Sequence, residues 1–237
     1  MKETFCFKKF KIDQERCAMK IGTDGVLLGA WTDVDFEPQS ILDIGAGTGV
    51  LSLMLAQRCD ALTIDALEID ENAYEQCVDN FEASPWGDRL YCYHAGLDEF
   101  VDEMDEVYDL IISNPPFYSE KVSSGNTLRD LARQNDTLPF TELVEGVSKL
   151  LSDAGRFSVI IPFKETEVFI NLANAEALYA LRVCHIKGHE DAPFKRSLIE
   201  FSRTKADTIV EVLIIEKERH VYTNEYIALT KDFYLKM

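Results

Sequence analysis

The sequence has no long apolar run. None of its 237 residues belong to a stretch that approaches the roughly 18 consecutive apolar positions typical of a membrane-spanning helix. The first residues also lack the apolar segment and small-residue cleavage site of a signal peptide. We therefore expect a soluble, cytoplasmic protein with no membrane partner.

Cysteine pairs at metal-binding spacing are also missing. The six cysteines are scattered without any C-x-x-C pattern, which fits neither a disulfide scaffold nor a thiolate zinc site. His185 and His189 are four residues apart, but they lie on either side of Gly188 and would not share a strand face. We predict reduced thiols and no metal.

Basic residues are few. The chain has 24 Lys and Arg against 42 Asp and Glu, for a formal net charge of −18. This balance argues against indiscriminate nucleic-acid binding, because phosphate neutralisation needs clustered cations. Two stretches are locally basic and are either solvated surfaces or phosphate-binding patches. They contain Lys8, Lys9, Lys11, Arg16 and Lys20 near the N-terminus, and Lys187, Lys195, Arg196, Arg203 and Lys205 in the C-terminal third.

The apolar content is sufficient for a full core. At 46% hydrophobic residues, the length fits a single domain spanning 1–237. Strand and helix patterns alternate as far as Pro162, and three consecutive strands follow at about 181–187, 197–203 and 209–216. This order predicts an α/β fold with a mostly parallel sheet, closed by a C-terminal antiparallel hairpin.

A glycine loop follows the strand at 41–44. Gly45, Gly47 and Gly49 precede a helix at 50–56, a β-turn-α unit in which backbone can approach a ligand. A dinucleotide fingerprint requires a glycine where this chain has Val50. Asp43 precedes the loop, and its carboxylate would repel a pyrophosphate but attract an ammonium group. The loop is therefore interpreted as holding an amino-acid-like moiety.

Acids follow the next strands. Glu68 ends the strand at 62–70, where such folds place an acceptor for ribose hydroxyls, and an amphipathic helix at 71–83 follows. A third strand at 90–95 leads to Asp98, a candidate acceptor for an adenine amine. Nearer the N-terminus, Thr23 or Asp24 is expected to cap a short apolar helix and to contact the ligand as well.

The sequence Asn114-Pro115-Pro116-Phe117 ends a buried strand at 110–114. Two prolines stop the strand and fix a stiff turn, which alone fits either a plain surface turn or a recognition turn. The loops after Asp43, Glu68 and Ile112 should meet at the carboxyl edge of one parallel sheet and form one pocket. In the polar stretch 118–136, Arg129 and Arg133 are helical neighbours that are either solvated or bound to phosphate.

Together these motifs resemble the class I S-adenosylmethionine-dependent methyltransferases that modify planar amino groups. The chain resembles more closely the bacterial tRNA(Val) adenine-37 N6-methyltransferase family, over nearly its whole length. The matching segments are the start Phe7-Lys8-Lys9-Phe10, residues 18–31, the loop Phe194-Lys195-Arg196 and residues 229–235. The resemblance implies a Rossmann-like, seven-stranded sheet with helices on both faces, an N-terminal cap at 1–35, S-adenosylmethionine as cofactor, tRNA as partner, and a monomer.

The resemblance also implies site roles. Asn114 and the Pro115 carbonyl would accept hydrogen bonds from the adenine amine while Phe117 stacks on the base. The implied cofactor residues are Thr23, Asp43, Gly45, Gly47, Glu68, Asp98 and Asn114. The implied substrate-binding residues are Pro116, Phe117, Tyr118, Lys195 and Arg196. One departure is Gly96, which stands where many relatives have the acid that binds the cofactor adenine, so that Asp98 or backbone amides would substitute.

Other functions share some of these features. The same fold methylates the side-chain amide of a protein glutamine, or a base of DNA or ribosomal RNA. A nicotinamide-dependent oxidoreductase is a different class, which Val50 disfavours. A noncatalytic cofactor-binding protein is another, which Asn114 disfavours.

Overall fold

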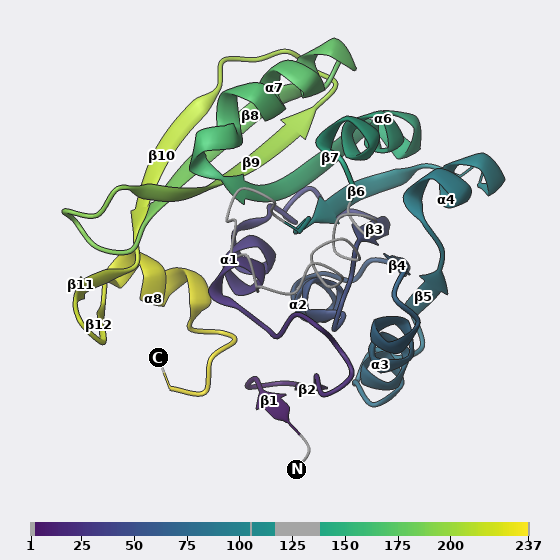
Figure 1. Ribbon diagram of the computed structural model, residues 1–237, viewed down its shortest axis with the longest axis horizontal. Coiled ribbons are helices and arrows are strands. Elements are labelled where there is room, and N and C mark those ends of the chain that lie inside the picture. The colour runs from purple at the N-terminus through teal and green to yellow at the C-terminus, as the bar shows by residue number, and fades with distance from the viewer. Residues whose placement is uncertain (1–2, 105, 117–137, 237) are drawn as a thin grey trace, which may run out of the picture.

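The computed structural model describes residues 3–104, 106–116 and 138–236. Its main sheet has eight strands (Figure 1). They are β3 (Ser40–Ile44), β4 (Thr63–Glu68), β5 (Leu90–His94), β6 (Tyr108–Ser113), β7 (Leu151–Pro162), β8 (Tyr179–Lys187), β9 (Phe194–Ser202) and β10 (Ile209–Ile214). The helices are α1 (Thr23–Trp31), α2 (Val50–Arg58), α3 (Glu71–Glu82), α4 (Leu97–Glu103), α6 (Phe140–Leu150), the 3-10 turn η1 (Phe163–Glu165), α7 (Thr166–Ala175) and α8 (Asn224–Thr230).

The strands are ordered β10-β8-β9-β7-β6-β3-β4-β5. Strands β3 to β7 run parallel, and β9 runs antiparallel to both β7 and β8. The predicted mostly parallel sheet with a C-terminal antiparallel hairpin is therefore confirmed. The expected number of seven strands is wrong, because β10 pairs in parallel with the outer edge of β8 and adds an eighth strand.

Helices cover both faces of the sheet. Figure 1 shows α1, α2, α3 and α8 on one face and α4, α6 and α7 on the other. The core is divided accordingly: Ile41 packs with the first group, and Leu42 and Ile44 with the second. Strands buried on both faces read as continuous apolar runs, which is why β3 and β6 were recognisable. The predicted helix at 71–83 is confirmed as α3, which buries Cys77 and Phe81.

A small N-terminal hairpin of β1 (Thr4–Cys6) and β2 (Lys11–Asp13) lies against α3. Asn80 fixes it there: its side-chain oxygen accepts from the Asp13 N–H, and its amide donates to the carbonyls of Asp13 and Thr48, all at 2.9 Å. The segment before α1 is thus tied to the glycine loop. A second short hairpin, β11 (Glu216–Glu218) with β12 (Val221–Tyr222), precedes α8.

The described part of the chain contains neither a membrane-spanning helix nor a metal-binding cluster. Within it, no helix combines the length and hydropathy needed to cross a membrane. The six cysteines are free thiols. No group of three or more His, Cys, Asp or Glu side chains among the described residues lies close enough together to hold a metal ion.

Candidate active site

Three of the predicted site residues, Asp43, Glu68 and Asn114, lie at the carboxyl ends of β3, β4 and β6. Ile44 pairs with Leu67 on one side and with Ser113 on the other, so these three residues lie side by side across the sheet. Asp43 precedes this row, and Glu68 and Asn114 directly follow it. The chain leaves β3 for β4 on one side and later returns to form β6 on the other side. Open α/β sheets bind ligands at the carboxyl ends of the strands where the strand order reverses in this way.

The glycine loop is open toward that edge. Gly45, Gly47 and Gly49 have φ values of 76°, 55° and 78°, a region that favours glycine. A Cβ atom built on Gly45 or Gly47 would have no atom within 4 Å, whereas one on Gly49 would lie 2.6 Å from the Phe81 ring. The first two glycines therefore leave room for a ligand, and the third permits close packing on α3.

Glu68 connects this loop to the end of β4. Its carboxylate accepts from the Gly47 N–H at 2.7 Å and from the Asp70 N–H at 2.9 Å. An ionised carboxylate offers about four acceptor sites, so two remain for other donors. The half-buried side chain is thus placed to bind hydroxyl groups beside the loop while it holds the loop in shape.

Asp43 is completely buried. Its Oδ2 atom accepts from the Ser52 hydroxyl at 2.7 Å and from the Ser52 N–H at 3.2 Å, while Oδ1 has no partner among the described residues. Burial raises the pKa of Asp43 to about 7, although the Ser52 bonds oppose the shift. An unpartnered buried carboxylate oxygen fits a cationic ligand. The sequence prediction missed Ser52, whose only signal was a serine inside an apolar helix.

Asn114 follows β6 as predicted. Its Oδ1 atom is buried and has no hydrogen-bond partner among the described residues. The Ser113 hydroxyl donates to the Ile44 carbonyl at 2.8 Å and so fixes the strand end. Pro115 is buried and Pro116 is half-buried. Phe117, Tyr118, Arg129 and Arg133 lie outside the described residues.

The N-terminus of α1 lies beside Asn114, since a Cβ on Gly25 would be 3.9 Å from the Asn114 amide nitrogen. The predicted capping of α1 by Thr23 or Asp24 is wrong. Gly22 is the N-cap residue and no side chain caps the helix. Asp24 instead accepts from Arg196 Nε at 2.8 Å, and Thr23 is exposed at the first helical position.

Asp98 lies at the end of β5, in the first turn of α4 after the N-cap Gly96. Its side chain is exposed and reaches back over Gly96, where a Cβ would lie 2.7 Å from Asp98 Oδ1. Glycine at 96 therefore leaves the space that the Asp98 carboxylate occupies.

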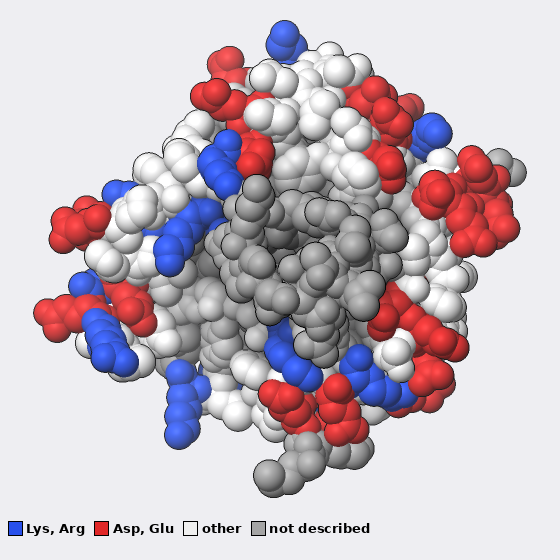
Figure 2. Space-filling model, viewed as in Figure 1, with Lys and Arg blue, Asp and Glu red and all other residues white. Residues whose placement is uncertain are grey.

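The two basic stretches lie in different places. Lys8 and Lys9 line a cavity at the C-terminal ends of α1 and α2, the opposite end of α1 from Asn114. Arg16 pairs with two acids of α3, and Arg203 donates to carbonyls at the end of α6. Arg196 is held at the Asn114 edge by Asp24. Figure 2 shows Lys and Arg side chains interspersed with acids toward the β8–β9 hairpin, whereas acids predominate on the side of α3 and α4.

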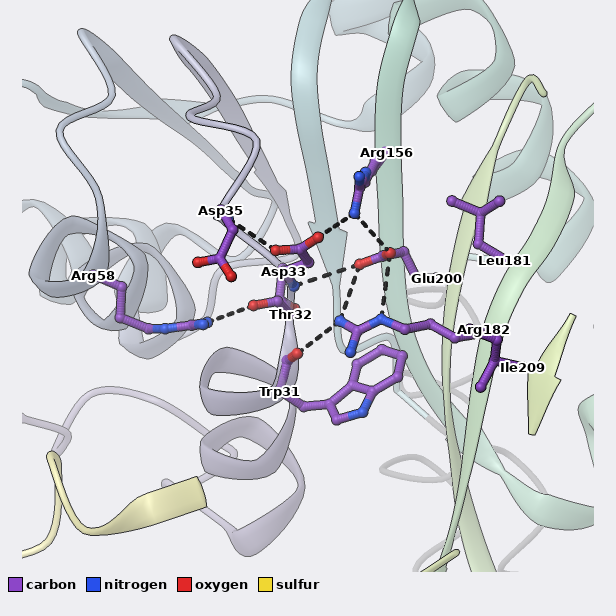
Figure 3. A pocket seen from close by; sticks show the side chains of 10 residues that line it. All are labelled: Trp31, Thr32, Asp33, Asp35, Arg58, Arg156, Leu181, Arg182, Glu200 and Ile209. Atoms are coloured by element: carbon purple, nitrogen blue, oxygen red, sulfur yellow. Dashed lines mark hydrogen bonds and ion pairs between the residues drawn. The ribbon is translucent and has the colours of Figure 1, made fainter. Parts of the chain in front are cut away.

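A separate cavity of about 460 Å³ lies at the amino edge of the sheet (Figure 3). Its charges neutralise one another. Glu200, only 1% exposed, is 3.2 Å from both Arg156 and Arg182, and Arg182 lies 3.9 Å above the Trp31 ring. Arg156 also pairs with Asp33. This arrangement is an ion network that links the segment after α1, β7 and the C-terminal hairpin.

We expect Glu200→Gln to lower the free energy of unfolding by about 3 kcal/mol, because removing one partner of a buried pair leaves uncompensated charge. The value is at the low end of the range for such changes, since both arginines are about one quarter exposed. Urea denaturation measures it, with Glu211→Gln on the exposed face of β10 as the control. A loss below about 0.5 kcal/mol, the ordinary range for surface substitutions, would contradict the role.

The chain is similar in sequence and in fold to methyltransferases. Residues 22–139 match the family model described as "Methyltransferase small domain". A structure described as a predicted O-methyltransferase from Agrobacterium tumefaciens superposes with a TM-score of 0.69 at 18% identity, covering 89% of this chain and 96% of that one. TYW2 of Pyrococcus horikoshii, solved in complex with MeSAdo, gives a TM-score of 0.57 at 15% identity and covers 85% and 71%. These similarities concern the fold.

Curated relatives identify the family. The chain is 60% identical over 233 residues to the tRNA1(Val) (adenine(37)-N6)-methyltransferase of Flavobacterium psychrophilum, covering 98% of this chain and 100% of that protein. It is 56% identical over 237 residues to the protein of the same name from Christiangramia forsetii, covering 99% of both. The chain belongs to the tRNA1(Val) (adenine(37)-N6)-methyltransferase family.

Proposed function

We propose that the protein transfers the methyl group of S-adenosylmethionine to the exocyclic N6 of adenine 37 in tRNA1(Val). The names of its relatives support the substrate. The observation that carries the chemistry is the buried Asn114 Oδ1 atom, which has no partner among the described residues and lies at a turn fixed by two prolines. An acceptor in this state suits an amino group that donates to it.

The residues at the strand ends fit the proposed cofactor. Asp43 offers a buried acceptor oxygen to the amino group of the cofactor. Gly45 and Gly47 leave room for the part of the cofactor that would lie against the backbone of the glycine loop. Glu68 retains acceptor sites for ribose hydroxyls. Asp98 would accept from the adenine amine and Thr23 would line the entrance. When bound, S-adenosylmethionine supplies an electrophilic methyl group on a sulfonium.

Asn114 and the Pro115 carbonyl would act on the acceptor nitrogen. The exocyclic amine of adenine delocalises its lone pair into the ring and is a poor nucleophile. Two acceptors on its N–H bonds draw the nitrogen toward a pyramidal geometry and return the lone pair to it. The methylated product loses its proton to water, so that no titrating base is needed and positioning determines the rate. We assign Pro116, Phe117 and Tyr118 to the substrate base.

The remaining parts have supporting roles in this proposal. We assign residues 1–35 to a cap within a single domain, and this assignment is supported by the hydrogen bonds of Asn80, which tie the N-terminal segment to the glycine loop. Arg196 and Lys195 flank the RNA. Because its proposed substrate is tRNA, we expect the enzyme to act in the cytoplasm, as a monomer.

Methyl transfer from labelled S-adenosylmethionine to purified substrates tests the function. We expect label in unmodified tRNA1(Val), recovered as N6-methyladenosine after nuclease digestion, and none in a transcript with guanine at position 37. Duplex DNA, ribosomal RNA and a release factor serve as the competing acceptors. Label in one of those substrates and none in tRNA would contradict the proposal.

Cofactor binding should depend on pH through Asp43. Its pKa of about 7 means that the carboxylate becomes charged as the pH rises through 7, while an α-amino group stays mostly protonated until about 8. We expect affinity for S-adenosylmethionine to increase about fivefold from pH 6 to pH 7.5. Below pH 7, where the Asp43 carboxyl of the free protein is mostly protonated, binding should release its proton.

Calorimetry at several pH values measures this dependence. Asp43→Asn should bind S-adenosylmethionine about 10- to 100-fold more weakly, since a hydrogen bond to a charged group contributes about 1.5–3 kcal/mol. Its affinity should not increase between pH 6 and pH 7.5. Asp102→Asn, which changes an exposed carboxylate on α4, should behave as the parent. An unchanged pH profile in Asp43→Asn would show that another group titrates.

A further inference from the structure

An aromatic cluster lies on the surface beside the candidate active site. Phe163 follows the carboxyl end of β7, and its ring is 4.9 Å from those of both Phe194 and His185. Phe163 is 36% exposed although it is a large apolar residue. The neighbouring rings are half-buried, so the cluster presents an aromatic face to solvent.

The cluster is held by a chain of hydrogen bonds. The Thr166 hydroxyl donates to the Phe163 carbonyl at 2.7 Å, so the Ser197 hydroxyl, 2.7 Å from Thr166 Oγ1, must donate to that oxygen. Ser197 Oγ then accepts from His185 Nδ1–H at 2.9 Å. Burial lowers the pKa of His185, which is consistent with a neutral ring in this tautomer. The rings are thus preorganised.

Lys187 lies beside this aromatic face, and Lys195 directly follows Phe194 in the sequence. The Lys187 ammonium lies 4.9 Å from the centre of the Phe194 ring, and the exposed Lys195 makes no ion pair among the described residues. In a protein of net charge −18, cations beside exposed aromatic rings are a local exception. Proteins that bind single-stranded nucleic acid combine these two features, because bases stack on aromatic rings and phosphates bind cations.

The cluster also lies near the turn at Asn114. Arg196, two residues after Phe194, bonds to Asp24, and Asp24 adjoins Gly25, which lies beside Asn114. Ser113 of β6 pairs with Val159 of β7, so these two residues lie side by side in the sheet. Counted along the chain from this pair, Asn114 is one residue further on and Phe163 is four residues further on. At about 3.3 Å per residue the two are separated by about 10 Å along the strands, a distance that a neighbouring nucleotide can span.

We propose that Phe163, supported by His185 and Phe194, stacks an unpaired base adjacent to the methylated adenine, while Lys195 binds its phosphate. This inference rests on the proposed function, because it takes single-stranded RNA as the substrate. It assigns recognition of the flanking nucleotide to the β7–β9 side of the site. The turn at Asn114 receives the target base itself.

Steady-state methylation of unmodified tRNA1(Val) tests the stacking. Since one stacked base contributes about 1–3 kcal/mol, we expect Phe163→Leu to raise KM for tRNA about 5- to 100-fold, with the affinity for S-adenosylmethionine unchanged. Phe163→Tyr should restore a KM close to that of the parent. Val168→Ala, at an exposed apolar residue on α7 outside the cluster, is the control.

The phosphate contact has its own measurement. We expect Lys195→Gln to reduce the slope of log affinity against log salt by about 0.7, the value for one contact to a single strand, and Lys149→Gln on α6 to leave it unchanged. A Phe163→Leu enzyme with the parent KM, or an unaltered salt slope in Lys195→Gln, would overturn this inference while leaving the methylation activity established. Failure of the parent enzyme to methylate any RNA would instead overturn the proposed function.

Discussion

Replacement of Asn114 by alanine should reduce methyl transfer by at least 100-fold. We assign its side chain to the acceptor amine and not to the cofactor, the second role that the resemblance implied, so the affinity for S-adenosylmethionine should stay within about twofold. The side-chain oxygen is buried, has no partner among the described residues, and is assigned to the acceptor amine. Losing it removes one of two hydrogen bonds that activate the nitrogen, which is a loss of transition-state stabilisation. Single-turnover kinetics with saturating tRNA measures this step, and calorimetry measures cofactor binding.

A matched control for this variant is Asn171→Ala. Asn171 is exposed on α7, on the opposite face of the sheet from α1, and the change should leave turnover unaffected. If Asn114→Ala retained more than about one tenth of the parent rate, the loss would be below about 1.4 kcal/mol in the barrier. Such a small loss would contradict the assigned role.

Glu68→Ala should weaken cofactor binding by about 100-fold or more, equivalent to about 2.7 kcal/mol. Two effects combine in this substitution. It removes the acceptor proposed for the ribose hydroxyls, and it releases the N–H groups of Gly47 and Asp70 that the carboxylate holds at 2.7 and 2.9 Å. The glycine loop then loses its tie to the end of β4, so that the cradle is no longer preorganised.

Glu82→Ala provides the comparison for Glu68, since Glu82 is an exposed acid at the end of α3. Titration of both variants with S-adenosylmethionine and with its demethylated product compares the effects of the two substitutions on binding. A Glu68→Ala protein that binds within threefold of the parent would show that the ribose acceptor has been misplaced. Loss of affinity in Glu82→Ala would show that the effect is one of overall charge.

The sequence predicted the positions that depend on local backbone chemistry. Val50 in place of a third fingerprint glycine distinguished the loop from a dinucleotide site. The doubled proline placed Asn114 at a strand end. The position of Glu68 at the same edge was expected because parallel strands bring their carboxyl ends together, and the structure aligns Ile44, Leu67 and Ser113 in one row there.

Contacts between distant segments were not predictable in the same way. Aspartate is a residue type that commonly caps helices, but the Asp24 carboxylate is bound by Arg196, 172 residues away. Arg16 and Arg203 appeared available for RNA, yet each is bound to acids or carbonyls of another element. Strand β10 was recognisable as a strand, whereas its pairing with β8 rather than β9 depends on the tertiary fold. Propensity and spacing do not determine such pairings.

Nucleoside mass spectrometry of tRNA1(Val) from cells tests the central claim most directly. A strain that lacks the gene should contain unmodified adenine at position 37, and expression of the parent enzyme should restore N6-methyladenosine there, while equal amounts of the Asn114→Ala protein should not. Adenine 37 still methylated in the deletion strain, or restored by Asn114→Ala as fully as by the parent, would contradict the account.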